Sequence, residues 1–273
     1  MPTRDSDLQT EECTLSDGRR LAYTTSGDAQ GHPVVAHHGT PGSRFFAALL
    51  SEPATEEQIQ LIVPDRPGYG HSSSPPAEWT WRDWQDDLNE LLDAESIDRA
   101  TVLGFSGGGP FAFAAANSDR VSRLGVISTV VPPAENGLTA LAKIPFALRI
   151  FFRLSNALAS ITGRDAIVKQ YTERSVSQSV SKAVGDDFHE SLRQGAKAVA
   201  RETRTFAKTS LEPKHLDVPV HAWHGTQDEN TPLSPVKTLV QEVDGRLVTP
   251  DTDHLGTLLD CRRDAFQWLR ADR

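Results

Sequence analysis

The stretch Gly104–Pro110, Gly-Phe-Ser-Gly-Gly-Gly-Pro, constrains the fold of this chain more than any other. The three residues before it are Thr-Val-Leu, an apolar and β-branched run that predicts the end of a buried strand. The alanine-rich run at 111–116 favours a helix. Glycines two residues before and after Ser106 leave room for a helix to fold back on a strand, and we expect strained backbone angles at the serine. A strand, a tight turn and a helix should therefore meet at Ser106. Taken alone, the pattern is equally consistent with a glycine-rich helix start that this serine caps.

Short apolar runs alternate with helical patterns on both sides of this turn. An Asp-Gly pair between residues 12–15 and 20–25 predicts an antiparallel hairpin. Further strands are expected at 33–36, 60–63, 100–104, 123–130, 218–223 and 246–250, and helices at 45–50, 79–94, 111–116, 234–243 and 256–269. This alternation predicts an α/β fold with a mostly parallel, doubly wound sheet and helices on both faces.

The alternation breaks between residues 132 and 213, where no strand-like run occurs. The apolar segment 138–162 is interrupted by Lys143, Pro145, Arg149 and Arg153 and is interpreted as two helices, and further helices are expected near 164–184 and 186–209. Open α/β sheets bind ligands at the carboxyl ends of their strands. We therefore interpret 132–213 as a helical cap over that edge, inserted into a core domain made of 1–131 and 214–273. An ordinary helical decoration is the alternative.

Charge and composition exclude several classes of partner. The formal net charge of −9 argues against nucleic acid, which needs a basic face, and against an anionic membrane surface. No run reaches the ~18 apolar residues of a membrane span, and no secretory signal is visible, so we expect a cytoplasmic protein. Cys13 and Cys261 match no metal or redox spacing, although a disulfide between them stays open. There is no nucleotide-binding glycine motif, and we expect neither a cofactor nor a metal. The oligomeric state is left open.

A nucleophilic serine needs a histidine as base and an acid that orients the histidine. In a strand–turn–helix of this type the acid and then the base should follow the serine in the chain, each on a loop after a strand. Asp228 follows strand 218–223, and His254 follows strand 246–250. Glu135 is the alternative acid, while Asp253 should point away from its neighbour His254.

The other histidines are weaker candidates for the base. His37 and His38 precede the serine in the chain. His221 and His224 form an H-x-x-H pattern, but residues three apart on a strand face opposite sides of the sheet and do not easily share one metal ion. The remaining four are expected to be surface or hydrogen-bonding residues: His32, His71, His189 and His215.

Two backbone N–H groups are expected to stabilise the negative charge that forms on the substrate oxygen. One belongs to Gly107, where the start of the following helix adds positive potential. The other should come from the loop at 38–42, and our candidate is the N–H of Thr40.

Five motifs in order, HGTPG (38–42), DRPGYGHS (65–72), GFSGGG (104–109), HGTQD (224–228) and DTDH (251–254), make the chain resemble the α/β-hydrolase superfamily. The resemblance covers nearly the whole chain outside the cap. It implies an eight-stranded sheet with a lid, Ser106 as nucleophile, Asp228 as acid, His254 as base, and Thr40 and Gly107 as oxyanion donors. It further implies that the DRPGYG segment, with Asp65 and Arg66, is structural framework.

The serine separates this chain from the epoxide hydrolases and haloalkane dehalogenases of that superfamily, which use an aspartate nucleophile. We expect a cofactor-independent serine hydrolase that acts on a small-molecule ester, lactone or thioester. The alternatives are a C–C bond hydrolase or a cofactor-free peroxidase with the same triad, and a non-enzymatic ligand receptor. Apolar residues of the cap either line the pocket or form the cap's own core: Phe146, Phe151, Phe152 and Leu154.

Overall fold

The computed structural model describes residues 8–134, 137–142, 144, 146–148, 150–152, 154, 163–212 and 216–271. Eight strands form one sheet in the order β1-β2-β4-β3-β5-β6-β7-β8. The strands are β1 Glu11–Thr14, β2 Arg20–Gly27, β3 His32–His37, β4 Ile59–Pro64, β5 Ala100–Phe105, β6 Val121–Ile127, β7 Val220–Trp223 and β8 Arg246–Val248. The β1–β2 and β2–β4 pairs are antiparallel and all other neighbours are parallel. The predicted α/β fold with a mostly parallel eight-stranded sheet is confirmed.

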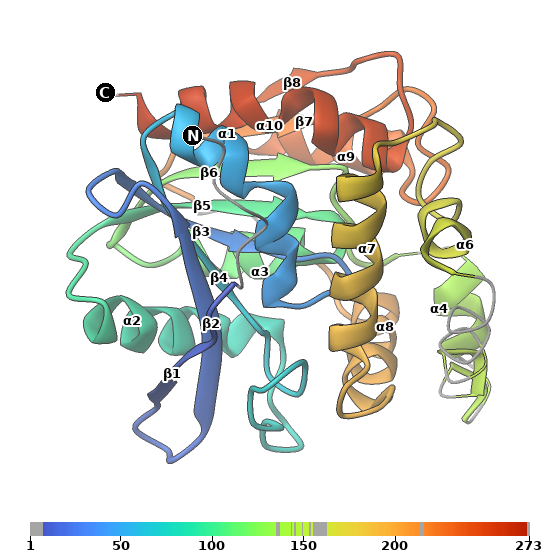
Figure 1. Cartoon of the computed structure of the whole chain (residues 1–273), viewed down its shortest axis with the longest axis horizontal. Coiled ribbons are helices and arrows are strands. Elements are labelled where there is room, and N and C mark those ends of the chain that lie inside the picture. Colours follow the sequence, from blue (N-terminus) through green and yellow to red (C-terminus); the bar gives the residue numbers. More distant parts are fainter. Residues whose placement is uncertain are drawn as a thin grey trace.

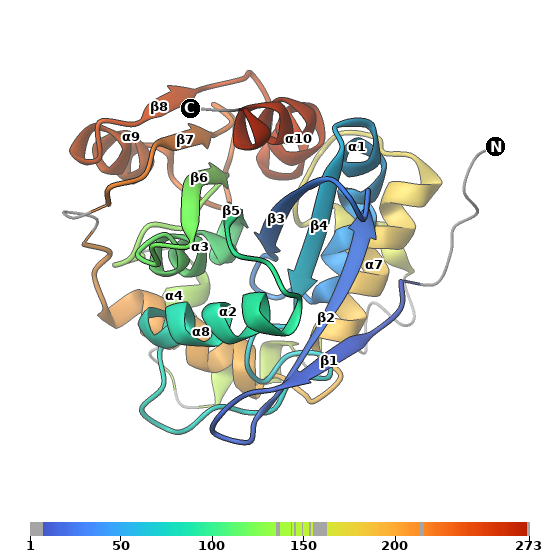
Figure 2. The ribbon, with the colours of Figure 1, turned by 90° about the vertical axis from the view of Figure 1, so that its left-hand side faces the viewer.

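Helices cover both faces of this sheet. Helices α1 (Ser51–Glu56) and α10 (His254–Arg270) pack on one face, and α2 (Trp84–Ala94) and α3 (Gly109–Ala115) pack on the other (Figure 2). Helix α9 (Leu233–Glu242) contributes its buried side chains to the same core as α2 and α3. Each face therefore has its own hydrophobic core, one containing Phe266 and the other Trp84.

The helices between β6 and β7 lie beyond the carboxyl ends of the central strands, on the right of Figure 1. Those whose bounds lie within the described residues are α4 Gly137–Ala142, α6 Arg164–Val168, α7 Gln178–Ser191 and α8 Lys197–Lys208. Among the described residues of this segment there is no strand, as the sequence pattern predicts. Part of the predicted helical stretch 138–162, including Lys143, Pro145, Arg149 and Arg153, falls outside the described residues.

The boundaries of two of these helices differ from the prediction. The predicted break near residue 185 is wrong, because α7 runs through Gly185 and the helix-free stretches lie at 169–177 and 192–196 instead. A Cβ on Gly185 would stand 2.5 Å from Cγ of Arg164, so this glycine allows α6 to pack closely on α7. Helix α7 begins where the Ser177 side chain accepts a hydrogen bond from the N–H of Val180.

Smaller corrections concern a strand end and two helix starts. Strand β6 ends at Ile127 rather than at 130, because Ser128 has a φ of 47° and turns the chain toward the loop at Ser106. The predicted helix at 45–50 is a 3-10 helix, η1 (Arg44–Leu49), and α2 is preceded by a short 3-10 turn, η2 (Trp81–Asp83). Both 3-10 segments begin at a side-chain cap, from Ser43 and from Thr80.

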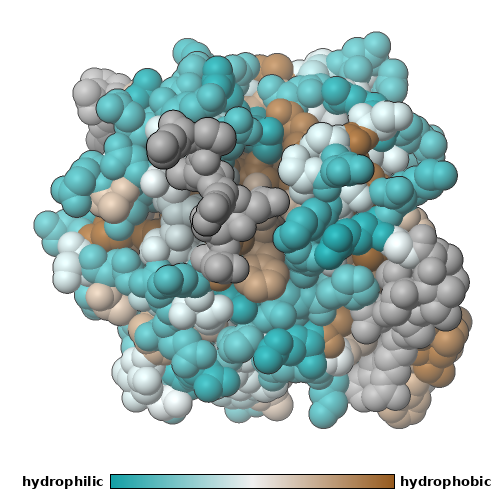
Figure 3. Space-filling model, in the orientation of Figure 1, coloured by the Kyte–Doolittle hydropathy of each residue, from teal (hydrophilic) through white to brown (hydrophobic). Residues whose placement is uncertain are grey.

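The surface in Figure 3 is mostly hydrophilic, with scattered hydrophobic patches. None of the helices in the described part of the chain has the length and apolar character that a membrane span requires. Both cysteines are free thiols, with Cys13 half-buried on β1 and Cys261 buried on α10.

Candidate active site

Ser106 lies at the carboxyl end of β5, in the sharp turn that leads into α3 through the 3-10 segment η3 (Ser106–Gly108). Its φ of 52° is in the left-handed region, which confirms the expected backbone strain. A Cβ on Gly104 would stand 2.8 Å from Cα of Gly109, and one on Gly108 would stand 2.2 Å from the carbonyl oxygen of His37. Both glycines are therefore required for the helix to fold back on the strand.

Asp228 and His254 meet at the same edge of the sheet. Asp228 follows β7, His254 is the first residue of α10, and His254 Nδ1 donates a 2.8 Å hydrogen bond to Asp228 Oδ2. The carboxylate also accepts from the N–H groups of Asn230 and Thr231 and from the Thr231 hydroxyl, each at 2.9 Å. Burial raises the pKa of Asp228, but the hydrogen bond and charge of His254, the Thr231 N–H and the charge of His224 outweigh it and lower the pKa to about 2. The acid is therefore ionised at neutral pH.

The imidazole of His254 contacts two aromatic rings. The ring of Phe105, the residue before Ser106, lies 5.0 Å from it between centroids, and the ring of Tyr171 stacks on it at 6.3 Å. Ser106 and His254 line the same cavity, of about 220 Å³. The three residues expected from the sequence thus converge on one place in the fold.

The other histidines are engaged elsewhere. His37 accepts a 2.7 Å hydrogen bond from the Trp84 indole, and its other ring nitrogen lies 3.0 Å from the carbonyl oxygen of Leu103. Burial lowers the pKa of His37 to about 3 and that of His38 well below its usual value, so both are neutral. His215 lies outside the described residues.

The H-x-x-H pair lies in two separate environments. His221 stacks on Trp223 at 4.0 Å, whereas a ring nitrogen of His224 lies 3.0 Å from the carbonyl oxygen of Thr231 and 3.6 Å from Asp228. No cluster of three or more possible metal ligands occurs among the described residues.

Of the two alternative acids, the structure describes Asp253, and its carboxylate is bonded away from His254. Asp253 caps α10, with Oδ1 accepting from the N–H of Gly256 at 2.9 Å and Oδ2 accepting from Thr172 Oγ1 at 2.7 Å. It therefore points away from the imidazole, as expected. Glu135 lies outside the described residues.

The backbones of Thr40 and Gly107 lie against each other beside Ser106. A Cβ on Gly107 would stand 2.2 Å from Thr40 Oγ1 and 3.2 Å from the Thr40 backbone nitrogen. Both residues line the 220 Å³ cavity, and Gly107 lies in the first turn of the helical segment that leads into α3. Two backbone N–H groups at this point are the arrangement expected for an anion on the reacting carbonyl oxygen.

A buried ion pair fixes the loop that contains Thr40. Arg66 is fully buried and donates to the carbonyl oxygens of His38 and Gly39, to Thr40 Oγ1 at 2.9 Å, and to both carboxylate oxygens of Glu202 at 3.0 and 2.9 Å. Glu202 lies on α8 and also accepts from the Thr40 hydroxyl at 2.9 Å and from Tyr69 at 2.7 Å. The loop is thus connected to a helix of the inserted segment through one carboxylate.

Asp65 holds the same loop from its other end. Its carboxylate accepts from the backbone N–H of Arg44 at 2.7 Å, from the Arg44 guanidinium at 2.8 Å and from the N–H of His71 at 2.9 Å. Asp65 and Arg66 are fully buried behind the loop and neither lines a cavity beside Ser106. This placement agrees with the framework role that the family resemblance implies.

Two cavities adjoin Ser106, and both are also lined by Thr40, Pro41 and Tyr171. The large cavity, of about 220 Å³, has further walls from Gly107, Val130, Ala134, Thr139, Phe151, Phe152, Gln170, Thr203, Phe206, Asn230, Thr231 and His254. The small cavity, of about 40 Å³, has further walls from Gly39, Phe46, Leu49, Phe105, Val184, Asp187, Phe188 and Leu255. Phe151 and Phe152 of the predicted cap residues therefore line a pocket, whereas Phe146 and Leu154 are exposed.

Asp187 is the acidic residue of the small cavity. Its Oδ1 accepts from the backbone N–H and the hydroxyl of Ser43, each at 2.7 Å. Burial raises the pKa of Asp187 to about 7 in spite of these hydrogen bonds. The carboxyl group is therefore near its titration midpoint at neutral pH.

Four residues of the site are absent from the predictions: Tyr171, Asp187, Glu202 and Thr231. Thr231 follows Asp228 by three residues, and a short Asp-x-x-Thr turn of this kind is a signal that the sequence does contain. The other three are isolated polar residues in a helical segment without a motif. Their roles depend on how that segment packs on the sheet, which periodicity does not determine.

Comparison with known proteins agrees with this fold. Residues 32–258 match the family model described as alpha/beta hydrolase fold. The chain is 29% identical over 240 residues to a soluble epoxide hydrolase from Corynebacterium sp. (strain C12), covering 80% of this chain and 81% of that protein. It is 29% identical over 239 residues to a non-heme chloroperoxidase from Streptomyces lividans, covering 81% and 83%. Among solved structures, an esterase from Exiguobacterium antarcticum superposes with a TM-score of 0.74 at 18% identity, covering 96% of this chain and 98% of that one.

Proposed function

We propose that this chain, which belongs to the α/β-hydrolase family, is a serine hydrolase that cleaves a small-to-medium carboxylic ester, lactone or thioester through an acyl-enzyme. The observation that carries the proposal is the 2.8 Å hydrogen bond from His254 to Asp228, next to a serine with a φ of 52° that lines the same cavity as the histidine. This is the set of groups that acyl transfer by a serine uses, in the chain order expected for a nucleophile on a strand–turn–helix.

In this mechanism Ser106 Oγ attacks the substrate carbonyl carbon while His254 accepts the hydroxyl proton. The Nδ1 nitrogen of His254 faces an ionised carboxylate, so Nδ1 carries the proton of the neutral ring and Nε2 is left to act as the base. Asp228 also stabilises the imidazolium that forms. The proton then passes from Nε2 to the leaving oxygen or sulfur, and the carbonyl–leaving-group bond breaks.

The backbone N–H groups of Thr40 and Gly107 stabilise the tetrahedral oxyanion. Because Arg66 and Glu202 hold the Thr40 loop before substrate arrives, these donors need little reorganisation during the reaction. Water, deprotonated by His254, then attacks the acyl-enzyme carbonyl. The bond between the acyl group and Ser106 Oγ breaks, His254 returns its proton to Oγ, and the carboxylic acid is released.

We also propose that residues 132–213 form a cap on a core domain composed of 1–131 and 214–273. In support, the large cavity is walled by Ser106 and His254 on the sheet side and by Thr139, Phe152 and Phe206 from the inserted segment. The substrate would then be enclosed between the two parts of the chain.

The proposal is tested with Ser106→Ala and a matched control, Ser96→Ala. Ser96 is also a serine with a positive φ, of 57°, but it is exposed at the end of α2. We expect Ser106→Ala to lose at least about a thousandfold in turnover of p-nitrophenyl acetate and all labelling by a fluorophosphonate. Ser96→Ala should keep both. Full activity of a folded Ser106→Ala variant would refute the assignment, and a wild-type serine that never labels would favour a receptor.

Two relatives suggest other reactions for the same fold. Opening of an epoxide by Ser106 would give an ether, which His254 and water do not hydrolyse, so the serine argues against that reaction. Cofactor-free peroxidase activity is the second candidate, because the Streptomyces lividans relative is named a non-heme chloroperoxidase. A halogenation assay with hydrogen peroxide, run beside the ester assay and a panel of C–C substrates, separates these activities.

A further inference from the structure

The two cavities beside Ser106 differ in size and in their access to His254. The small cavity has a volume of about 40 Å³ and the large one about 220 Å³. Among the described residues, His254 lines the large cavity and is not part of the wall of the small one. Ser106 and Thr40 belong to both walls. A carbonyl carbon bound at Ser106, with its oxygen at Thr40, would therefore have one substituent in each cavity.

Proton transfer determines which substituent lies in which cavity. The leaving oxygen must receive its proton from His254, so the leaving group has to lie on the side where His254 is accessible. That side is the large cavity. The acyl chain, which receives no proton, is left with the small cavity, whose wall contains Ser106 but not His254.

We propose that this enzyme is selective for esters that join a short acyl group, acetyl or propionyl, to a larger and mainly apolar alcohol or phenol. This inference rests on the proposed serine hydrolase function. A water-sized group needs roughly 10–15 Å³ of such volume, so the small cavity of about 40 Å³ holds about three water-sized groups, or about one to two of the larger methyl and methylene groups. The large cavity has room for an aromatic ring system, and Phe151, Phe152 and Phe206 line it.

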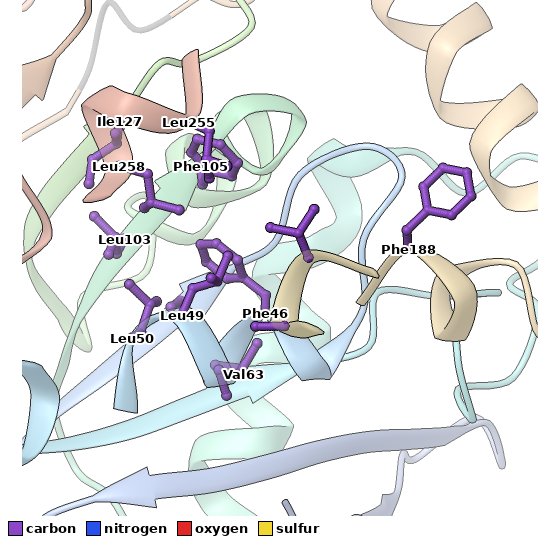
Figure 4. Close-up of a cluster of buried hydrophobic side chains, with 14 of the residues drawn as sticks. Phe46, Leu49, Leu50, Val63, Leu103, Phe105, Ile127, Phe188, Leu255 and Leu258 are labelled. Atoms are coloured by element: carbon purple, nitrogen blue, oxygen red, sulfur yellow. The ribbon is translucent and has the colours of Figure 1, made fainter. Parts of the chain in front are cut away.

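The small cavity is bounded by the main hydrophobic core and has little freedom to expand. Phe46, Leu49, Phe105 and Leu255 are all buried members of one core cluster, drawn in Figure 4, and the rings of Phe46 and Phe105 stack at 5.5 Å. Displacing such close-packed side chains is costly. The carboxyl group of Asp187 in the same wall adds a second barrier, because a longer alkyl chain would contact a polar group without solvating it.

The wall of the large cavity is less constrained. Phe151 is 40% exposed, and Ala134, Thr139 and Gln170 come from loops and the short helix α4 of the inserted segment. Selectivity should therefore be strict for the acyl part and permissive for the alcohol part.

The test uses two ester series. The acyl series consists of p-nitrophenyl acetate, butyrate and octanoate, in which the leaving group is constant. We expect kcat/KM to fall at least tenfold from acetate to octanoate. The alcohol series compares phenyl acetate with 2-naphthyl acetate, whose phenols have similar acidities, and we expect the naphthyl ester to be turned over at least as well.

Leu49→Ala and its neighbour Leu50→Ala form a matched pair of variants. Both leucines are buried in the same core, but only Leu49 lines the small cavity. We expect Leu49→Ala to raise the octanoate-to-acetate ratio of kcat/KM by about tenfold, and Leu50→Ala to leave it unchanged. Because each ratio is measured within one variant, it does not depend on how much of that variant is folded.

The outcomes distinguish this inference from the proposed function. Turnover of esters with a preference for octanoate, or an unchanged ratio in Leu49→Ala, would overturn the inference and leave the serine hydrolase intact. An absence of any ester turnover together with an unlabelled Ser106 would overturn the proposed function itself.

Discussion

The substitution Glu202→Gln tests how the loop that contains Thr40, the proposed oxyanion donor, is supported. Glu202 is buried and accepts two hydrogen bonds from Arg66, at 3.0 and 2.9 Å, and one each from Thr40 and Tyr69. Glutamine has nearly the same shape but no charge. The N–H groups of its amide would point at a side chain that is itself a hydrogen-bond donor. The fully buried guanidinium of Arg66 would then lose its counter-ion and keep only uncharged partners, namely two backbone carbonyls, the Thr40 hydroxyl and one glutamine oxygen.

The expected loss of stability follows from this burial. Removing one partner of a buried ion pair costs about 3–5 kcal/mol, and we expect the lower end because glutamine still accepts one hydrogen bond. At roughly 2–4 °C for each kcal/mol in a chain of this size, the melting temperature should fall by about 6–12 °C. Whichever way the glutamine amide points, one of its N–H groups faces either the Arg66 Nε–H or the Thr40 hydroxyl. This repulsion displaces the loop, so the backbone N–H of Thr40 becomes less well placed. Since one oxyanion donor is worth about 10²–10³ in kcat, a partial displacement should cost about tenfold.

The assay combines thermal unfolding with kcat for p-nitrophenyl acetate. The matched control is Asp186→Asn on α7, because Asp186 also forms ion pairs in the inserted segment, with Arg164 at 3.0 Å and Lys182 at 2.8 Å, but at the surface. Such exposed pairs contribute less than about 1 kcal/mol. If Glu202→Gln lowered stability no more than Asp186→Asn and left kcat unchanged, the reasoning about the loop would be wrong.

Two further predictions concern pH and close packing. The pKa of Asp187 is raised from 3.8 to about 7, so the folded state favours the protonated carboxyl, and the stability that this form contributes is lost as pH rises through about 7. Asp187→Asn should therefore be more stable than the wild type at pH 8–9, by roughly 1–3 kcal/mol after allowing for partial exposure, and this gain should shrink as the pH falls below 7 and vanish at about pH 3, below the ordinary carboxyl pKa of 3.8. A gain in urea titrations that is the same at both ends of this pH range would contradict the reasoning. Gly108→Ala should destabilise the fold by about 3 kcal/mol or more and abolish esterase activity, since its Cβ would stand 2.2 Å from the carbonyl oxygen of His37. Gly18→Ala, at a φ of 83° with open space around it, should cost only about 1 kcal/mol in the same titrations, and equal losses in the two variants would argue against the close-packing explanation.

Local patterns in the sequence were sufficient to predict the sheet and the three residues that meet at its edge. The strand before Ser106 and those before Asp228 and His254 are short apolar runs, and parallel strands bring their carboxyl ends together. The order of the motifs along the chain therefore predicts their proximity in space.

Packing between distant segments was not predictable in the same way. Glycine often interrupts a helix, yet Gly185 lies inside α7, where Arg164 packs against it. The partnership of Arg66 with Glu202 joins residues 136 positions apart, and no local pattern connects them. The two cavities likewise depend on how the inserted helices cover the sheet, so their sizes could not be predicted from the sequence.

The left-handed backbone of Ser106 has an evolutionary consequence. A serine with a φ of 52° destabilises the native state by about 1–2 kcal/mol relative to glycine, the residue that adopts this conformation freely. Glycine at position 106 would thus be favoured by selection for thermal stability alone, although it would remove the proposed nucleophile. A serine is expected to persist there only in lineages where turnover is under selection. Loss of activity in a descendant of this protein should therefore begin with a mutation that makes it more stable.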